Sequence, residues 1–152
     1  INFLLIEALL MELNYYPIKY KNDNDLEELI KYHNLPEKKK YISLSGNFFD
    51  YVINNKNVFY LKIKIYNDLV GELQIEKDTE IIYIALWIKP KKQKQGITSR
   101  VLIDVLNEKF VKFNKVIVSI DKDNQTSLAL FTKIGFKHTK QEDELIYFEY
   151  KK

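Results

Sequence analysis

The feature that most constrains the fold is an apolar run, Ile81–Ile88, which stops shortly before Pro90. A short apolar run bounded by turn residues is typical of a buried strand, and proline has no N–H with which to extend a ladder. The chain then passes through a basic loop and enters an amphipathic segment at Gly96, where the missing Cβ lets a ligand approach the backbone. The next turn offers N–H groups at the positive end of a helix dipole. With Lys89, Lys91, Lys92 and Lys94 around it, the pattern predicts a phosphate site.

The glycines limit which phosphate ligand this site could take. The chain has four glycines, too far apart for the G-x-G-x-x-G fingerprint of dinucleotide folds or for a G-x-x-x-x-G-K-[ST] loop. Residues 93–98 instead read Gln-Lys-Gln-Gly-Ile-Thr, and Ile88-Lys89-Pro90 precedes them. This segment resembles the [QR]-x-x-G-x-[GA] pyrophosphate loop of the GNAT superfamily of acetyl-CoA-dependent N-acetyltransferases, which follows a hydrophobic-x-Pro.

A second motif follows at the spacing expected for that superfamily. Residues 124–136 read Asn-Gln-Thr-Ser-Leu-Ala-Leu-Phe-Thr-Lys-Ile-Gly-Phe and resemble the N-x-x-[AS]-x-x-x-[YF]-x-K-x-G-F helix that closes the coenzyme A site. Two positions depart from the family pattern. Thr98 stands where glycine or alanine is usual, and Phe131 stands where many members carry a tyrosine that protonates the departing thiolate. A phenyl ring has no proton to donate, so that role is vacant or is filled elsewhere.

The resemblance implies a cofactor site as well as a fold. In GNAT proteins two parallel strands splay apart at their C-terminal ends, and the pantetheine arm of acetyl-CoA lies in the gap. Here those strands would be Ile81–Ile88 and Val116–Ile120. The residues expected to bind acetyl-CoA are Leu86, Trp87, Ile88, Gln93, Lys94, Gln95, Gly96, Ile97, Thr98, Ser99, Asn124, Ser127, Phe131 and Lys133.

Composition narrows the class of protein. A chain of 152 residues can bury one core, so we expect a single domain over 1–152. The absence of cysteine excludes disulfides and is typical of a cytoplasmic protein. A net charge of +3 gives no reason to expect nucleic acid, and residues 1–11, too short to span a membrane, predict an extra helix or a leader. His33 and His138 lack metal-ligand spacing, so no metal is expected. The sequence leaves open whether the protein forms a homodimer.

The order of the elements predicts an α+β fold. Helical spacing over Ile97–Phe113 joins the buried strand to Val116–Ile120, and such a crossover requires a parallel pair. We therefore expect a mixed, mostly antiparallel sheet of about seven strands flanked by about four helices. The other expected elements are an edge strand Tyr15–Tyr20 containing Pro17, a helix from Leu26, a short helix around Phe48–Val52, strands Val58–Tyr66 and Leu69–Glu76, a helix after Asn124, and a hairpin of Lys137–Thr139 and Leu145–Tyr150.

The register of the central hairpin suggests catalytic residues. If the 77–80 turn closes it symmetrically, residue 76 faces 81, 72 faces 85, and Glu72 and Tyr83 share one face near the splay. Acetylation of an amine needs a base to remove a proton, directly or through water, and Glu72 is the candidate, with Tyr83 beside it. The alternative is that Glu72 is a solvated residue of the sheet face and Tyr83 belongs to the core.

The sequence therefore predicts an N-acetyltransferase that moves acetyl from acetyl-CoA to a primary amine of a small molecule or peptide by direct attack. That reaction needs no metal and no covalent enzyme intermediate. The alternative is a degenerate relative that holds acyl-CoA, or another protein, without turnover, and Thr98 and Phe131 are the features that favour it.

Overall fold

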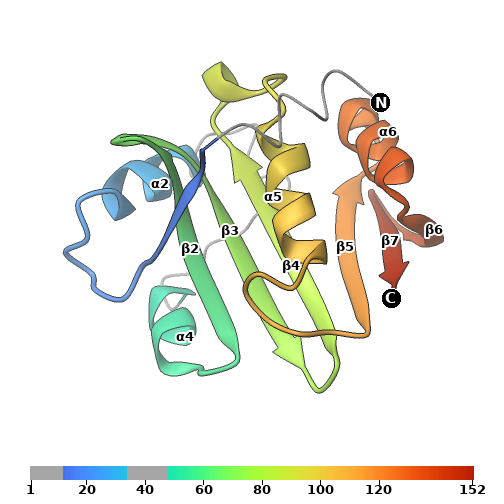
Figure 1. The fold of residues 1–152 in the computed structure, drawn as a ribbon, viewed down its shortest axis with the longest axis horizontal. Coiled ribbons are helices and arrows are strands. Elements are labelled where there is room, and N and C mark those ends of the chain that lie inside the picture. Colours follow the sequence, from blue (N-terminus) through green and yellow to red (C-terminus); the bar gives the residue numbers. More distant parts are fainter. Residues whose placement is uncertain (1–11, 34–47) are drawn as a thin grey trace.

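The computed structural model describes residues 12–33 and 48–152, in which four α-helices flank one seven-stranded sheet (Figure 1). The strand order is β1-β2-β3-β4-β5-β7-β6, and all neighbours are antiparallel except β4 and β5. The predicted fold class is thus confirmed. The strands are β1 Asn14–Pro17, β2 Val58–Ile65, β3 Asp68–Asp78, β4 Ile81–Ile88, β5 Lys115–Asp121, β6 Lys137–Glu142 and β7 Leu145–Lys151. The helices are α2 Leu26–His33, α4 Phe48–Asn54, α5 Ile97–Leu106 and α6 Gln125–Ile134, with a 3-10 turn η1 at Pro90–Lys92.

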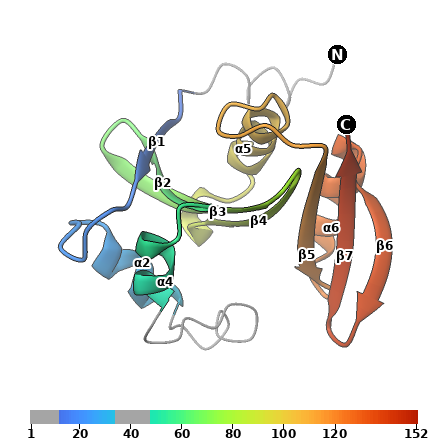
Figure 2. The ribbon, with the colours of Figure 1, turned by 90° about the horizontal axis from the view of Figure 1, so that it is seen from below.

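Two hydrophobic clusters hold the helices against the sheet. Figure 2 shows α5 on one face of strands β1–β4 and α2 with α4 on the other. On the α5 face, buried residues such as Leu73, Ile82 and Val101 form a core that also includes Phe131 of α6. On the other face, Leu29 of α2 and Trp87 of β4 belong to a smaller cluster. Because side chains of a strand alternate between faces, β4 contributes to both clusters.

The parallel pair of β4 and β5 is short. The two strands are in register only from Ile81 opposite Lys115 to Tyr83 opposite Ile117, and beyond that they separate (Figure 1). The closed end is held by Asn114, whose N–H donates to the Glu80 carbonyl at 2.7 Å. The C-terminal half of β4 therefore faces a separated strand, as the resemblance implied.

The hairpin of β3 and β4 has a register that differs by two residues from the predicted one. Asp78 pairs with Ile81, Glu76 with Tyr83, and Glu72 with Trp87. The cause is a turn of only two residues, of which Thr79 adopts a left-handed φ of 55°. Because the shift is even, every side chain stays on its predicted face, and Glu72 and Tyr83 still share one.

Two predicted boundaries were wrong. Helix α5 ends at Leu106 rather than near Phe113, because Glu108 adopts a left-handed φ of 58° just after the capping residue Asn107. Phe113 continues the helical spacing in the sequence but lies in the connection to β5, where it is buried in the core. Strand β1 stops at Pro17, and it pairs with β2 at the edge of the sheet as that proline predicted. The expectation for residues 1–11 lies outside the described residues.

Candidate functional site

The end of β4 presents backbone groups to the strand separation. The Lys89 N–H donates to the Val70 carbonyl of β3 at 2.8 Å, and strand backbone groups alternate in direction. Trp87 therefore also directs its backbone to β3, whereas Leu86 and Ile88 direct theirs away from β3 and toward the separated side. Of the three strand residues expected to bind acetyl-CoA, Trp87 is not placed to pair with a ligand in the separation through its backbone, whereas Leu86 is, and so is the N–H of Ile88.

Gly71 explains how β3 and β4 approach each other at this end. A Cβ built on Gly71 would lie 2.2 Å from the Trp87 carbonyl oxygen, far inside any normal contact. Only glycine therefore allows this approach, which fixes the position of the Trp87 carbonyl and, with it, the neighbouring peptide groups that face the separation. The sequence analysis assigned no role to Gly71.

The loop after β4 leads into α5 through a left-handed glycine. The Gln93 side chain donates from Nε2 to the Ile88 carbonyl at 3.0 Å, which ties the loop to the strand end. Lys94 and Gly96 adopt φ values of 63° and 83°, and Gly96 is the N-cap of α5. Because glycine offers no side chain, no side-chain oxygen of the N-cap competes for the first N–H groups of the helix. The arrangement suits an anion, with Thr98 and Ser99 of the first turn adding hydroxyl groups.

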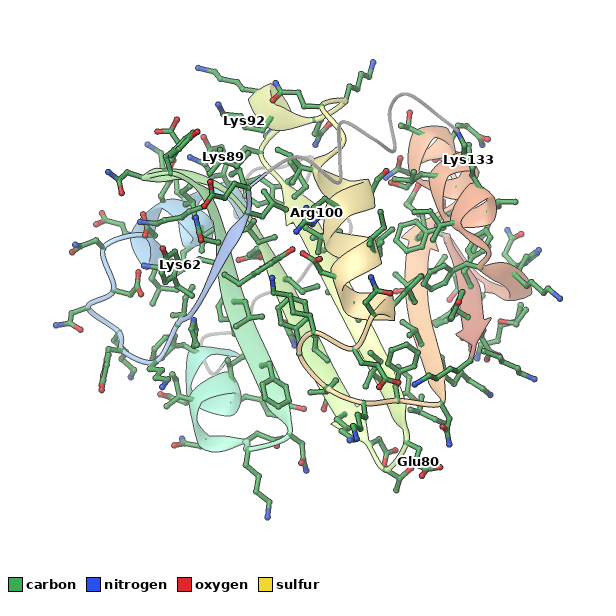
Figure 3. All side chains as sticks on the ribbon, viewed as in Figure 1. Lys62, Glu80, Lys89, Lys92, Arg100 and Lys133 are labelled. Atoms are coloured by element: carbon green, nitrogen blue, oxygen red, sulfur yellow. The ribbon has the colours of Figure 1, made fainter. Side chains whose placement is uncertain are left out.

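The lysines around the loop divide into two groups, and Figure 3 labels one of each, Lys89 and Lys92. Lys89 forms an ion pair with Glu28 of α2 and lies 5.5 Å from the centre of the Tyr32 ring, so it holds α2 rather than the loop. The sequence analysis placed Lys89 at the phosphate site and could not foresee this ion pair, because its partner lies 61 positions earlier in the chain. Lys91, Lys92 and Lys94 form no ion pair with the part of the chain that the structure describes. Their charge is available to a phosphate group.

Helix α6 supplies the other predicted contacts. The Asn124 side chain caps the helix by accepting the Ser127 N–H at 3.1 Å, so its oxygen is already engaged. Phe131 is buried and meets Phe136 edge to face at 5.0 Å between ring centres. Lys133 is exposed, and Figure 3 places it with Lys92 at the open end of the separation, opposite to Glu80. Phe131 therefore occupies the position of a core residue.

A partly buried polar cluster was missed in the sequence. Arg100 of α5 donates from Nε to Asp104 at 3.2 Å, and the Tyr15 hydroxyl of β1 donates to the same carboxylate at 2.5 Å. Burial, together with the Asp104 carboxylate, raises the pKa of Tyr15 above its ordinary range, so the phenol remains a donor. The i,i+4 spacing of Arg100 and Asp104 was a visible signal, but Tyr15 is distant in sequence. The cluster fixes α5 to the edge strand.

The two proposed catalytic residues are not close to each other. Tyr83 lies at the last position of β4 that pairs with β5 and is 43% exposed. Glu72 lies on β3 opposite Trp87 and is 7% exposed. The four residue steps along β4 from Tyr83 to Trp87 span roughly 13 Å. Glu72 also lies one strand away from the separation, with Trp87 between, and it accepts a hydrogen bond from the Tyr60 hydroxyl. The two side chains therefore cannot act as one pair on a single amine.

A metal site and a membrane-spanning helix each place their own requirements on the described residues. No group of three or more His, Cys, Asp or Glu side chains there could hold a metal ion. None of the helices described in 12–33 and 48–152 is long and apolar enough to cross a bilayer.

Comparison with known proteins gives the family of this fold. The family model described as the acetyltransferase (GNAT) family matches residues 24–136, whereas no curated protein has a matching sequence. Among solved structures, the Campylobacter jejuni N-acetyltransferase PseH in complex with acetyl coenzyme A has a TM-score of 0.74 at 16% identity, covering 93% of this chain and 99% of that one. A domain from Methanocaldococcus jannaschii has a TM-score of 0.72 at 21% identity, covering 93% and 99%. Arabidopsis thaliana NAA60 in complex with acetyl-CoA has a TM-score of 0.71 at 16% identity, covering 92% and 98%. The chain belongs to the GNAT acetyltransferase family.

Proposed function

We propose that the protein transfers the acetyl group of acetyl-CoA to a primary amine. The observation that carries this proposal is the geometry of the open end, where β4 and β5 separate after Tyr83 and Ile117 and α5 begins at Gly96 without a side-chain cap. The pyrophosphate would lie against the first turn of α5 among the free lysines, and the pantetheine arm would run between the strands. The complexes of PseH and of NAA60 with acetyl-CoA support the same cosubstrate for this chain.

The chemistry is a direct attack. The amine nitrogen adds to the thioester carbonyl carbon, the new C–N bond forms, and the C–S bond breaks to release coenzyme A as its thiolate. The attacking ammonium must first lose a proton, and the thiolate must gain one. No titratable side chain stands at Phe131, so we assign the proton for the thiolate to water.

The group that accepts the proton of the amine is also assigned as part of this proposal. Tyr83 is at the closed end of the separation, where the thioester end of a molecule running from the loop toward the paired strands would arrive. Its hydroxyl group can orient the water that accepts the proton. Glu72 could accept that proton only through a further chain of water around Trp87, so we place it second.

A thiol assay tests the proposal with little background. The chain has no cysteine, so a thiol-reactive dye reports only coenzyme A released from acetyl-CoA. We expect release that depends on an amine in a screen of polyamines, aminoglycosides, amino acids and peptides. Gly96→Glu should abolish release and the thermal stabilisation by acetyl-CoA, because it adds bulk and negative charge at the pyrophosphate. Gln141→Glu adds the same charge on the exposed strand β6 and should change neither.

The alternative function is cofactor binding without turnover, which Thr98 and Phe131 favour. In that case acetyl-CoA would raise the melting temperature of the wild type and not of Gly96→Glu, but no amine would release coenzyme A. Equal stabilisation of both variants would remove the loop from the cofactor site and count against both functions.

A further inference from the structure

A hollow lies beside the closed end of the strand separation, on the face that carries α2 and α4. It has a volume of about 380 Å³ and is lined by the end of the β3–β4 hairpin and the loop after α4. The residues around it are Asn55, Asn57, Glu76, Lys77, Asp78 and Tyr83. Tyr83 also marks the last paired position of β4 and β5, so the hollow adjoins the place where the thioester end of the cofactor would arrive.

Glu76 lies between two exposed tyrosines. It pairs across the strands with Tyr83, which is 43% exposed, and it accepts a hydrogen bond from the Tyr51 hydroxyl of α4, which is 44% exposed. The Glu76 carboxylate has no ion pair within residues 12–33 and 48–152. A carboxylate beside two exposed aromatic side chains is a suitable environment for an ammonium group.

The neighbouring lysines do not neutralise this site. Lys77 also lines the hollow, but it follows Glu76 along β3, so its side chain leaves the strand on the face opposite to that of Glu76 and Tyr83. Lys56 lines the adjoining hollow with Tyr51 and forms no ion pair with Glu76, whereas Asp50 of that hollow pairs with Lys21 at 3.2 Å. Asp78 adds a second negative charge to the rim.

We propose that this hollow binds the second, non-reacting cation of a small diamine acceptor, with Glu76 as the specificity-determining residue. This inference rests on the proposed function, because it assumes that the reacting amine lies beside Tyr83. Glu76 is one strand further from the separation than Tyr83, a spacing of roughly 5 Å. A short aliphatic diamine can bridge that distance, with one nitrogen at the thioester and the other at the carboxylate.

Calorimetric titration tests the site without acetyl transfer. The protein is saturated with coenzyme A and titrated with 1,4-diaminobutane or with n-butylamine, which has the same carbon chain and one charge fewer. We expect the diamine to bind at least about tenfold more tightly, and Glu76→Gln to remove roughly that factor while n-butylamine binding stays unchanged. Tyr51→Phe keeps the ring and removes the hydroxyl that orients the carboxylate, so a smaller loss is expected. Glu142→Gln makes the same charge change on β6 and should have no effect.

Two results would overturn the inference. One is equal affinity of the wild type for the two amines, and the other is diamine affinity that survives in a folded Glu76→Gln protein. Circular dichroism melting shows whether each variant is folded. Absence of coenzyme A release with every amine would reject the proposed function and leave the titration readable, so the two failures are distinguishable.

Discussion

Gly71→Ala should destabilise the protein, although alanine is ordinarily the better strand residue by about 0.5–1 kcal/mol. The added Cβ would lie 2.2 Å from the Trp87 carbonyl oxygen and 2.9 Å from Cδ1 of Ile88. The oxygen belongs to the backbone and cannot rotate away, so β3 and β4 must move apart by roughly 1 Å to reach an ordinary contact. The hydrogen bond from Lys89 N–H to Val70, now 2.8 Å, would then exceed the length of a hydrogen bond.

The cost follows from these two changes. Overpacking typically costs about 1–3 kcal/mol and each lost hydrogen bond about 1 kcal/mol, so the net loss in the free energy of unfolding should be about 2–3 kcal/mol. For a chain of this size the melting temperature should fall by about 4–12 °C. The affinity for acetyl-CoA should fall as well, because Leu86 and Ile88 move with the strand.

Thermal denaturation followed by circular dichroism measures the first effect, and calorimetric titration with acetyl-CoA the second. Ser119→Ala places the same side chain at an exposed position of β5 and should change stability by less than about 0.5 kcal/mol. Ile88→Val in the Gly71→Ala background removes Cδ1 but leaves the carbonyl in place, so it should not restore stability. A Gly71→Ala protein that melts within about 1 °C of the wild type, or full recovery in the double variant, would refute this reasoning.

Three further predictions concern other residues. Phe131→Leu keeps an apolar side chain against Phe136, so its pH–rate profile should retain every ionisation of the wild type. Loss of an acidic group from the profile of this variant alone would contradict the view that water protonates the thiolate. Burial alone would raise the pKa of Asp25, but hydrogen bonds from Lys62 and Lys64 hold this pKa below its ordinary range. Asp25 therefore stabilises the folded state at neutral pH, and this stabilisation is lost as the pH falls through the folded pKa. Asp25→Asn should therefore lower stability by about 1–3 kcal/mol at pH 7, and melting curves should show the difference shrinking below about pH 4; a constant difference would contradict the assignment. Glu72→Gln should lower kcat/KM by less than about tenfold, because Trp87 separates Glu72 from the strand gap. A loss of roughly 10²–10⁴-fold, with disappearance of the acidic limb of the pH–rate profile, would instead identify Glu72 as the base.

The features that could be predicted from the sequence are those with local causes. Strand β4 has the predicted bounds, because an apolar run between a turn and a proline leaves little choice. The Gly96 cap and the Asn124 cap follow in the same way from single residues whose backbone or side chain suits a helix start. The parallel pair followed from the helical crossover between its strands.

The features that could not be predicted depend on partners far away in the chain. Lys89 seemed to belong to the phosphate loop, but Glu28 draws it to α2. The end of α5 was placed too late, because Phe113 keeps the helical spacing while it fills the core from a loop. The hairpin register depended on whether its turn has two residues or four, and both choices bury the same face.

The short seam between β4 and β5 divides the chain into two sequence-contiguous modules. Everything on the β5 side lies in residues 115–152, and the described residues on the β4 side all precede residue 107, so a single connection joins the modules. Strands β2, β3 and β4 in one module, and β6 and β7 in the other, can pair from neighbouring segments before the modules meet, whereas β1 must join β2 across the residues between Pro17 and Val58. Docking along the three paired positions then joins the two modules. The incomplete strand pairing that leaves this gap thus also leaves only three positions to align when the modules dock.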